Sequence, residues 1–191
     1  MEPFIALLLI LGIVVLIGVV YYNKIVGLKI RVGEGWSDIQ VQLKRRHDLI
    51  GNLVETVKGY ATHEKETLDK VVQARNTAKQ AEGQDSATIQ SAERMLSSAL
   101  SGLKINALAE AYPDLKANTN FLQLQAELAD TENKIGASRR FYNTTVRDLN
   151  TIIEQFPGNL FKGMAKAEPA KFFELDEDKA KEIQEPPKVS F

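Results

Sequence analysis

The stretch KRRHDLIGNLVETVKGYATHEKE, residues 44–66, decides the fold. Its apolar residues follow a helical spacing, and charged residues interrupt that spacing at two positions. Apolar residues recur there and before it in steps of three and four, which predicts the buried face of a long helix in a bundle or coiled coil. That face consists of Trp36, Ile39, Leu43, Ile50, Leu53, Val57 and Tyr60. Arg46 and Glu64 stand where the pattern expects apolar residues, so the stretch is either a catalytic site or the charged seam of a helix bundle.

The two histidines of this stretch lack the partners that a metal or catalytic site requires. A zincin helix needs a second histidine four residues after the first, but Thr67 stands at that distance from His63. His47 lies about four helical turns earlier, and one helix cannot bring the two rings together. His47 and Asp48 are adjacent on the helix, so they do not face each other. We therefore expect no catalytic residue, no metal ligand and no cofactor, and we expect that the protein is not an enzyme.

The composition of the chain excludes further classes of function. The protein has 191 residues, a formal net charge of -1 and no cysteine. Because acidic and basic residues are interspersed, no concentrated basic face is available for nucleic acid. The absence of cysteine excludes disulfides and cysteine nucleophiles. We expect neither a nucleic-acid partner nor a small-molecule substrate.

The segment FIALLLILGIVVLIGVVYY, residues 4–22, carries no charge and predicts a membrane-spanning helix. At 1.5 Å per residue it reaches about 28 Å, close to the ~30 Å thickness of the hydrocarbon core. The alternative is a cleaved signal peptide, which would have a basic start, a shorter apolar core and small residues at a cleavage site. The acidic Glu2, the long core and the closing pair Tyr21 and Tyr22 favour a retained anchor.

The charges that flank this segment predict its orientation. Lys24, Lys29 and Arg31 follow it, whereas only the α-amine and Glu2 precede it. By the positive-inside rule, the N-terminus lies outside and the rest of the chain lies in the cytoplasm.

The rest of the chain predicts an all-α fold, with the transmembrane helix continuing into an up-down antiparallel helical bundle that has a long first helix. We divide the chain into a transmembrane anchor (1–23), a juxtamembrane stalk (24–35), a helical bundle (36–164) and an extended C-terminal tail (165–191). Gly27, Gly33 and Gly35 leave two alternatives for the stalk, a hinge or a continuous helix of slightly lower stability.

The helix boundaries follow from turn and capping residues. Without a break, the first helix would reach Ala81, where a turn begins, and Asp85 or Ser86 would cap the second helix. That second helix would end near Tyr112, and Asp114 would cap the third.

The third helix would end at Pro157-Gly158 and be followed by a short fourth helix at Leu160 and Phe161.

The third helix repeats the interruption seen in the first. Glu132 and Arg139 stand among Leu128, Ile135 and Tyr142 of its apolar face. A charge in a helix interface is costly unless it is paired, so we predict inter-helix ion pairs that fix register or subunit pairing. The alternative is that the seams are partly exposed and the long side chains reach water. The predicted polar seam comprises Arg45, Arg46, Asp48, Glu64, Glu132, Arg139 and Arg140.

The tail carries apolar residues that predict docking. Phe172 and Phe173 form an apolar pair, and the chain closes with Val189, Ser190 and Phe191. Such an ending has the form that some PDZ domains accept by strand addition. We favour docking of Phe172, Phe173 and Phe191 onto the protein's own bundle, because short tails match that pattern by chance.

The sequence resembles the LemA family over nearly all of the chain after the apolar segment. WSDIQVQLKRRHDLIGNLVETVKGYATHEKETLDKVVQAR, residues 36–75, resembles the first signature helix of that family. LKANTNFLQLQAELADTENKIGASRRFYNTTVRDLNTIIEQFPGNLF, residues 115–161, resembles the second, and PAKFFEL and PPKVSF resemble the tail. Gly51 stands where the family usually has proline, and Gly33 and Gly35 replace better helix formers, which puts the rigidity of the stalk in question.

The resemblance implies a bacterial single-pass protein of the inner (plasma) membrane with a cytoplasmic helical bundle and no established catalytic activity. Relatives in magnetosome membranes, and others encoded beside integral-membrane metalloproteases, imply scaffolding or quality control. We therefore expect a non-enzymatic membrane-associated scaffold that contacts membrane lipid and forms homo-oligomers. The alternative is an adaptor that delivers clients or signals to a membrane metalloprotease.

Overall fold

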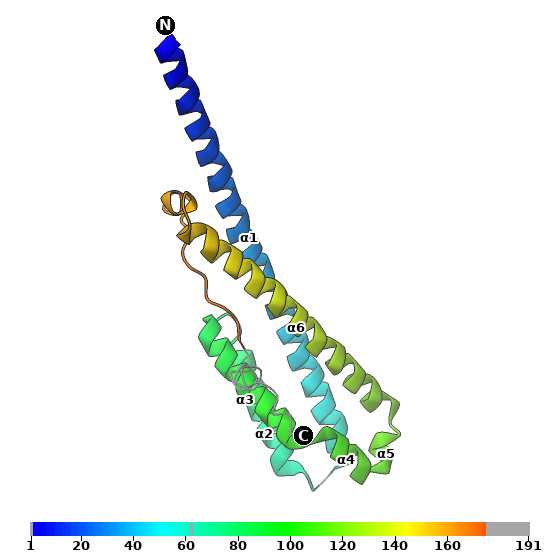
Figure 1. Cartoon of the computed structure of the whole chain (residues 1–191). Helices are drawn as coiled ribbons and strands as arrows, with labels where there is room; N and C mark the ends of the chain where they lie inside the picture. Colours follow the sequence, from blue (N-terminus) through cyan, green and yellow to red (C-terminus); the bar gives the residue numbers. More distant parts are fainter. Residues whose placement is uncertain (1, 62, 175–191) are drawn as a thin grey trace, which may run out of the picture. The chain divides into compact units, whose positions relative to one another are not determined.

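The computed structural model describes residues 2–61 and 63–174, and in these ranges all regular structure is helical (Figure 1). The elements are α1 (Glu2–Lys58), α2 (Lys65–Gln80), α3 (Ser86–Leu103), α4 (Ile105–Ala111), α5 (Pro113–Lys116), α6 (Thr119–Glu154) and the 3-10 turn η1 (Gly158–Leu160). The predicted all-α fold with a long first helix is confirmed.

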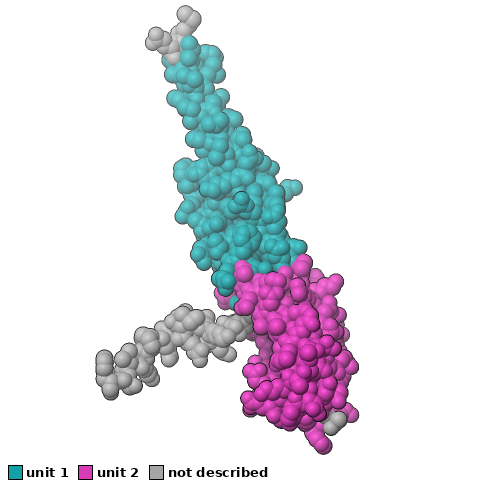
Figure 2. Space-filling model, turned by 90° about the vertical axis from the view of Figure 1, so that its right-hand side faces the viewer, with its two compact units in different colours: residues 1–39, 138–172 teal, residues 40–137, 173–191 magenta. Residues whose placement is uncertain are grey.

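The described chain forms two compact units, coloured separately in Figure 2. Of the described residues, the first unit contains residues 2–39 together with Ser138–Phe172. Of the described residues, the second contains Gln40–Ala137 together with Phe173 and Glu174. Both α1 and α6 contribute residues to each unit, so each unit is described in turn.

In the first unit, the long apolar helix α1 packs against the later part of α6. Ile25 of α1 is fully buried against Leu149 and Ile153 of α6, and Ala165 and Ala167 close this core. Farther along α1, the ring of Trp36 lies 5.6 Å from that of Tyr142. The side chains are eleven residues apart on α1 and seven and four residues apart on α6. Each spacing is close to a whole number of helical turns, so each set lies on one helix face and the two faces pack together.

The segment after η1 is tied to α6 by polar side chains. Asn150 donates from Nδ2 to the carbonyl of Ala170 and accepts from the Ala170 N–H, at 2.9 and 2.8 Å. The hydroxyl of Tyr142 donates to the carbonyl of Lys171 at 2.9 Å. Residues 165–171 contain no helix or strand, and these hydrogen bonds attach the segment to α6.

The N-terminal part of α1 is long and apolar enough to cross a membrane, which fits a membrane anchor or a signal sequence. Its large apolar side chains between Phe4 and Val20 are 42–66% exposed. The helix continues without interruption through Gly27, Gly33 and Gly35, so the continuous alternative describes the stalk.

In the second unit, α1 ends at Lys58, and the prediction of one helix reaching Ala81 is wrong. The N–H groups of Tyr60 and Ala61 both donate to the carbonyl of Val57 at 2.9 Å, which closes the helix in a turn. Gly59 at this turn is a weak helix former. Because α2 then reverses direction, Leu68 and Val71 are buried on a second helix that contacts α3 extensively.

The capping predictions have mixed outcomes. Asp85 caps α3 as predicted, since its Oδ1 accepts from the N–H groups of Ala87 and Thr88 at 3.0 and 3.2 Å. However, α3 ends at Leu103 rather than near Tyr112, because Lys104 adopts a left-handed backbone with φ 45°.

The short helices α4 and α5 follow α3, and the prediction that Asp114 caps the third long helix is wrong. Asp114 lies inside α5. Oδ1 of Asn118 instead accepts from the N–H of Phe121 at 3.0 Å in the first turn of α6. Nδ2 of Asn118 also donates to the hydroxyl of Tyr60 at 2.8 Å, which ties the start of α6 to the end of α1.

The fourth predicted helix is reduced to η1, the 3-10 turn at Gly158–Leu160.

Candidate functional site

A buried cluster of charged side chains joins the helices of the second unit. Arg46 and His47, consecutive on α1, both reach Glu93 on α3. Nη1 of Arg46 donates to Oε2 of Glu93 at 2.8 Å, and Nε2 of His47 lies 2.6 Å from Oε1. The three side chains are 5%, 1% and 1% exposed. Because Glu93 has two oxygens, its carboxylate contacts both neighbouring side chains of α1, Arg46 at Oε2 and His47 at Oε1.

The second nitrogen of His47 also faces a carboxylate. Nδ1 lies 2.9 Å from Oε1 of Glu82, in the turn between α2 and α3. A neutral imidazole has a single N–H, so only the protonated ring can donate to both carboxylates. Burial alone would lower the pKa of His47, but the hydrogen bonds and charges of Glu93 and then Glu82 outweigh it and raise the pKa above its ordinary value of 6.5. The two carboxylate contacts and the raised pKa therefore favour the imidazolium form of His47.

The guanidinium of Arg46 connects α1 to both α3 and α6. Nη2 donates to Oγ of Ser97 on α3 at 2.9 Å, and Nε lies 2.7 Å from Oε1 of Glu132 on α6. Glu132 is about half exposed, unlike Glu93. Three long helices thus meet at one buried guanidinium in this unit. That this contact fixes their register stays a prediction.

This charged network, comprising Arg46, His47, Glu82, Glu93, Ser97 and Glu132, is poorly suited to catalysis. Both nitrogens of His47 face carboxylates, so the ring has no nitrogen free to activate a hydroxyl nucleophile. The hydroxyl of Ser97 is engaged by Arg46. Within residues 2–61 and 63–174, no cluster of three or more His, Cys, Asp or Glu side chains could hold a metal ion.

A second contact fixes the backbone of α1 beside the charged network. Nε of Arg75, on α2, donates to the carbonyl of His47 at 2.6 Å. The guanidinium lies against Gly51, where an added Cβ would come within 2.8 Å of Nη2. Asp48 lies 3.5 Å from Lys79 and 3.9 Å from Arg75. The glycine that replaces the expected proline is therefore the residue that leaves room for Arg75.

The members of the predicted polar seam are distributed over several contacts. Arg46 and Glu132 form an ion pair, and Arg45 lies 3.7 Å from Glu127 at a half-exposed position. Glu64 precedes the first residue of α2 instead of joining Arg46. Arg139 is half-buried and Arg140 is exposed, both in the part of α6 that belongs to the first unit. Whether the seam sets register between subunits stays a prediction.

The two tail phenylalanines that the structure describes differ in burial. Phe173 is fully buried in the second unit, whereas Phe172 is 42% exposed in the first. The N–H of Glu174 donates to Oε1 of Gln90 at 3.2 Å, so the chain lies on α3 at this point. Phe191 lies outside the described residues, and its docking stays a prediction.

The sequence reasoning missed Glu82, Glu93 and Ser97. A signal for Glu93 was present, because it lies four residues after Ile89 and three before Leu96, on the apolar face of α3. Glu82 gave no such signal, since it lies in a turn where an acidic residue is ordinary.

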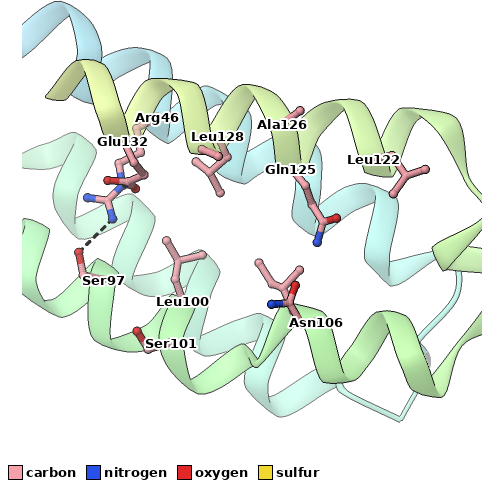
Figure 3. A pocket seen from close by; sticks show the side chains of 12 residues that line it. Arg46, Ser97, Leu100, Ser101, Asn106, Leu122, Gln125, Ala126, Leu128 and Glu132 are labelled. Carbon is pink, nitrogen blue, oxygen red and sulfur yellow. Dashed lines mark hydrogen bonds and ion pairs between the residues drawn. The ribbon is translucent and has the colours of Figure 1, made fainter. Parts of the chain in front are cut away.

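An open groove of about 700 Å³ lies beside the charged network (Figure 3). Leu100 of α3 and Leu128 of α6 point toward each other across it, and Arg46 and Glu132 lie at one end. Its walls come from α1, α3, α4 and α6 and consist of Arg46, Ser97, Leu100, Ser101, Ile105, Asn106, Leu122, Gln125, Ala126, Leu128, Ala129 and Glu132. The mainly apolar lining suits an apolar segment rather than a charged metabolite.

The fold and the network define an all-α protein in which a long apolar helix runs on into a bundle fastened by buried ion pairs. The model of the LemA family matches residues 35–191, and the chain belongs to this family. Protein LemA of Metamycoplasma hominis is 28% identical over 155 residues, which cover 77% of this chain and 68% of that protein. The family resemblance predicted from the sequence is confirmed.

Proposed function

We propose that the protein is a non-enzymatic, membrane-anchored scaffold that forms homo-oligomers and organises membrane or protein partners. The observation that carries the proposal is the exposed apolar surface of α1 between Phe4 and Val20. Burying one Val, Leu or Ile side chain is worth about 1.5–3 kcal/mol, so leaving this surface in water would be strongly unfavourable. A bilayer is the environment that satisfies a helix of this length and composition.

The same proposal assigns an orientation in the inner membrane of a bacterial cell. Lys24, Lys29 and Arg31 follow the apolar segment and favour a cytoplasmic bundle with the N-terminus outside. In right-side-out vesicles, an external protease should leave the bundle intact. Digestion of the bundle in intact vesicles would reverse the proposed orientation, and release of the chain from the membrane by carbonate would contradict the anchor.

A scaffold role is supported by the charged network, which uses its ionisable groups to join helices. Membrane tethering raises the local concentration of such bundles and favours lateral assembly. Sizing of the full chain in detergent by light scattering should give a homogeneous oligomer. A monomer at all accessible concentrations would contradict the scaffold.

The groove beside Arg46 supports a second candidate function. Its apolar lining could receive an apolar segment of a client, as expected of an adaptor for a membrane metalloprotease. In that case, the chain should be monomeric in detergent and should co-purify with a metalloprotease. Replacing Leu128 by aspartate should then abolish the association, whereas the same change at the exposed Val41 should not.

A further inference from the structure

A turn in the first unit presents an unusual concentration of apolar side chains to the surroundings. Phe156, Leu160 and Met164 lie just after α6 and are 79%, 66% and 65% exposed. The turn, residues 156–164, is held in place, since Asn159 and Phe161 donate backbone hydrogen bonds of 2.9 Å to the carbonyls of Gln155 and Gly158. These side chains are therefore exposed in an ordered segment.

This turn lies directly beside the apolar part of α1. The ring of Phe161 stacks on Tyr21, with centroids 6.4 Å apart. A Cβ on Gly18 would come within 3.1 Å of the Phe161 ring, so the two segments are in close contact. Phe161 and Met164 also line an apolar pocket of about 550 Å³ together with α1 residues that include Val14 and Val15.

The contact with Gly18 fixes the depth of the turn relative to the apolar segment. Gly18 lies four residues before Tyr22, which corresponds to about 6 Å along the helix. When residues 4–22 cross the ~30 Å hydrocarbon core, Phe161 lies inside the boundary that Tyr22 marks.

The basic residues near this boundary complement the apolar ones. Lys24, Lys29 and Arg31 follow the span on α1, and Lys162 and Lys166 lie in or just after the turn. Neither residues 22–33 nor residues 156–167 include an acidic residue. Nζ of Lys29 donates to the carbonyl of Lys166 at 2.9 Å, which joins the two basic segments.

We propose that residues 156–164 are a second membrane-contacting element, which inserts Phe156, Leu160 and Met164 into the leaflet where α1 leaves the bilayer. The partner is a lipid surface with anionic headgroups, which the lysines bind while the apolar side chains enter the acyl region. An acyl chain fills the apolar pocket between α1 and the turn. This inference rests on the proposed membrane anchor and adds a second attachment to it.

Depth-dependent quenching tests this inference in the full chain, which has no natural cysteine. The variants V15C, L160C and S37C are labelled singly with an environment-sensitive fluorophore. They are reconstituted in vesicles of phosphatidylcholine and phosphatidylglycerol that contain nitroxide-labelled lipids. Val15 tests the anchor, Leu160 tests the turn, and the exposed Ser37 lies on α1 about 22 Å beyond Tyr22 as the control.

We expect loss of fluorescence for V15C and L160C and none for S37C. Loss for V15C alone would overturn the inference and leave the anchor intact, whereas no loss for V15C would overturn the anchor itself. In vesicles of phosphatidylcholine alone, the quenching of L160C should fall and that of V15C should not. Equal quenching of L160C in both lipids would overturn the part assigned to anionic headgroups.

Discussion

At the scale of residues, the central group is Glu93, a buried carboxylate shared by two cations of another helix. Arg46 and His47 are nearly inaccessible to solvent, so neither can exchange its protein partner for water. A buried charge that loses its partner is strongly destabilising, even where the intact pair contributes little net stability. The charged network therefore favours one arrangement of the helices by penalising every other one.

Replacing Glu93 by glutamine should lower the unfolding free energy by about 3 kcal/mol, because it removes the one buried carboxylate that Arg46 and His47 share. Arg46 then keeps only the half-exposed Glu132 as a counter-charge, and His47 keeps only the half-exposed Glu82. The quantity is measured by urea denaturation of the full chain in detergent. Glu66→Gln is the matched control, since Glu66 pairs with Lys70 on the exposed face of α2 and its loss should change stability far less. Equal effects of the two variants would show that the network has no special role.

The stability that His47 contributes should decrease as pH rises. The folded pKa is raised above 6.5, so between the two pKa values the folded state holds more protons than the unfolded state. The contribution is fully present below about pH 6.5 and is lost as pH rises through the folded pKa.

This pH dependence is measured as the difference in unfolding free energy between the wild type and His47→Gln. The difference in favour of the wild type should shrink as pH rises above about 6.5. His63→Gln, at the chain's other histidine, is the matched exposed control. A difference that is constant across this range would refute the imidazolium assignment.

At the scale of elements, α1 owes its fit against α2 to the absence of a side chain at position 51. The guanidinium of Arg75 occupies the space that a Cβ would need, and it bonds the carbonyl of His47 one turn earlier. Glycine costs a helix up to about 1 kcal/mol relative to alanine. A charged hydrogen bond is worth about 1.5–3 kcal/mol, which is enough to offset that cost.

The effect of Gly51→Ala should therefore depend on Arg75. In the Arg75→Ala background, the substitution should stabilise the protein by up to about 1 kcal/mol, the full helix-propensity gain. In the wild type, the gain should be cancelled or reversed, because the guanidinium must move. A double-mutant cycle measured by urea denaturation gives the coupling.

Gly33→Ala is the control for this cycle, because nothing lies within 4 Å of an added Cβ at Gly33. It should stabilise α1 in both backgrounds. Additive effects of Gly51→Ala and Arg75→Ala would contradict the steric account.

At the scale of the whole molecule, α1 and α6 are continuous elements that supply both compact units with part of their cores. The core of the first unit includes Ile25 and Ile153, and that of the second includes Leu96 and Leu53. Because breaking either helix costs backbone hydrogen bonds in both units, we expect the units to unfold together.

Leu96→Ala in the second unit tests this coupling. The substitution should cost about 2–5 kcal/mol, because Leu96 is fully buried. Trp36, the single tryptophan, reports on the first unit by fluorescence, and circular dichroism reports on all helices. Both signals should shift to the same lower denaturant midpoint. A tryptophan transition that stays at its wild-type midpoint would show that the units unfold independently.

The helical class and much of the core were predictable from the sequence, because the spacing of apolar residues is a local property of the chain. Ile39, Leu43, Ile50 and Leu53 were identified from their spacing, and all are buried. Arg46 and Glu132 were identified as charges on apolar faces, and they form an ion pair. The helix end at Lys58 was not predictable in this way. Leu68 and Val71 continue the apolar spacing beyond Lys58, so the pattern gives no sign that a new helix, α2, begins there.

The sequence by itself determined the apolar segment at residues 4–22 and the helical fold, since each depends on composition or on short-range periodicity. The family followed from the resemblance of whole sequence blocks to the LemA family. Only the tertiary structure decided that Glu93 is the shared partner of Arg46 and His47, and that Arg75 occupies the space at Gly51. It alone placed Phe161 against Gly18. These contacts join residues far apart in the chain, and no local pattern specifies which side chains from different helices meet.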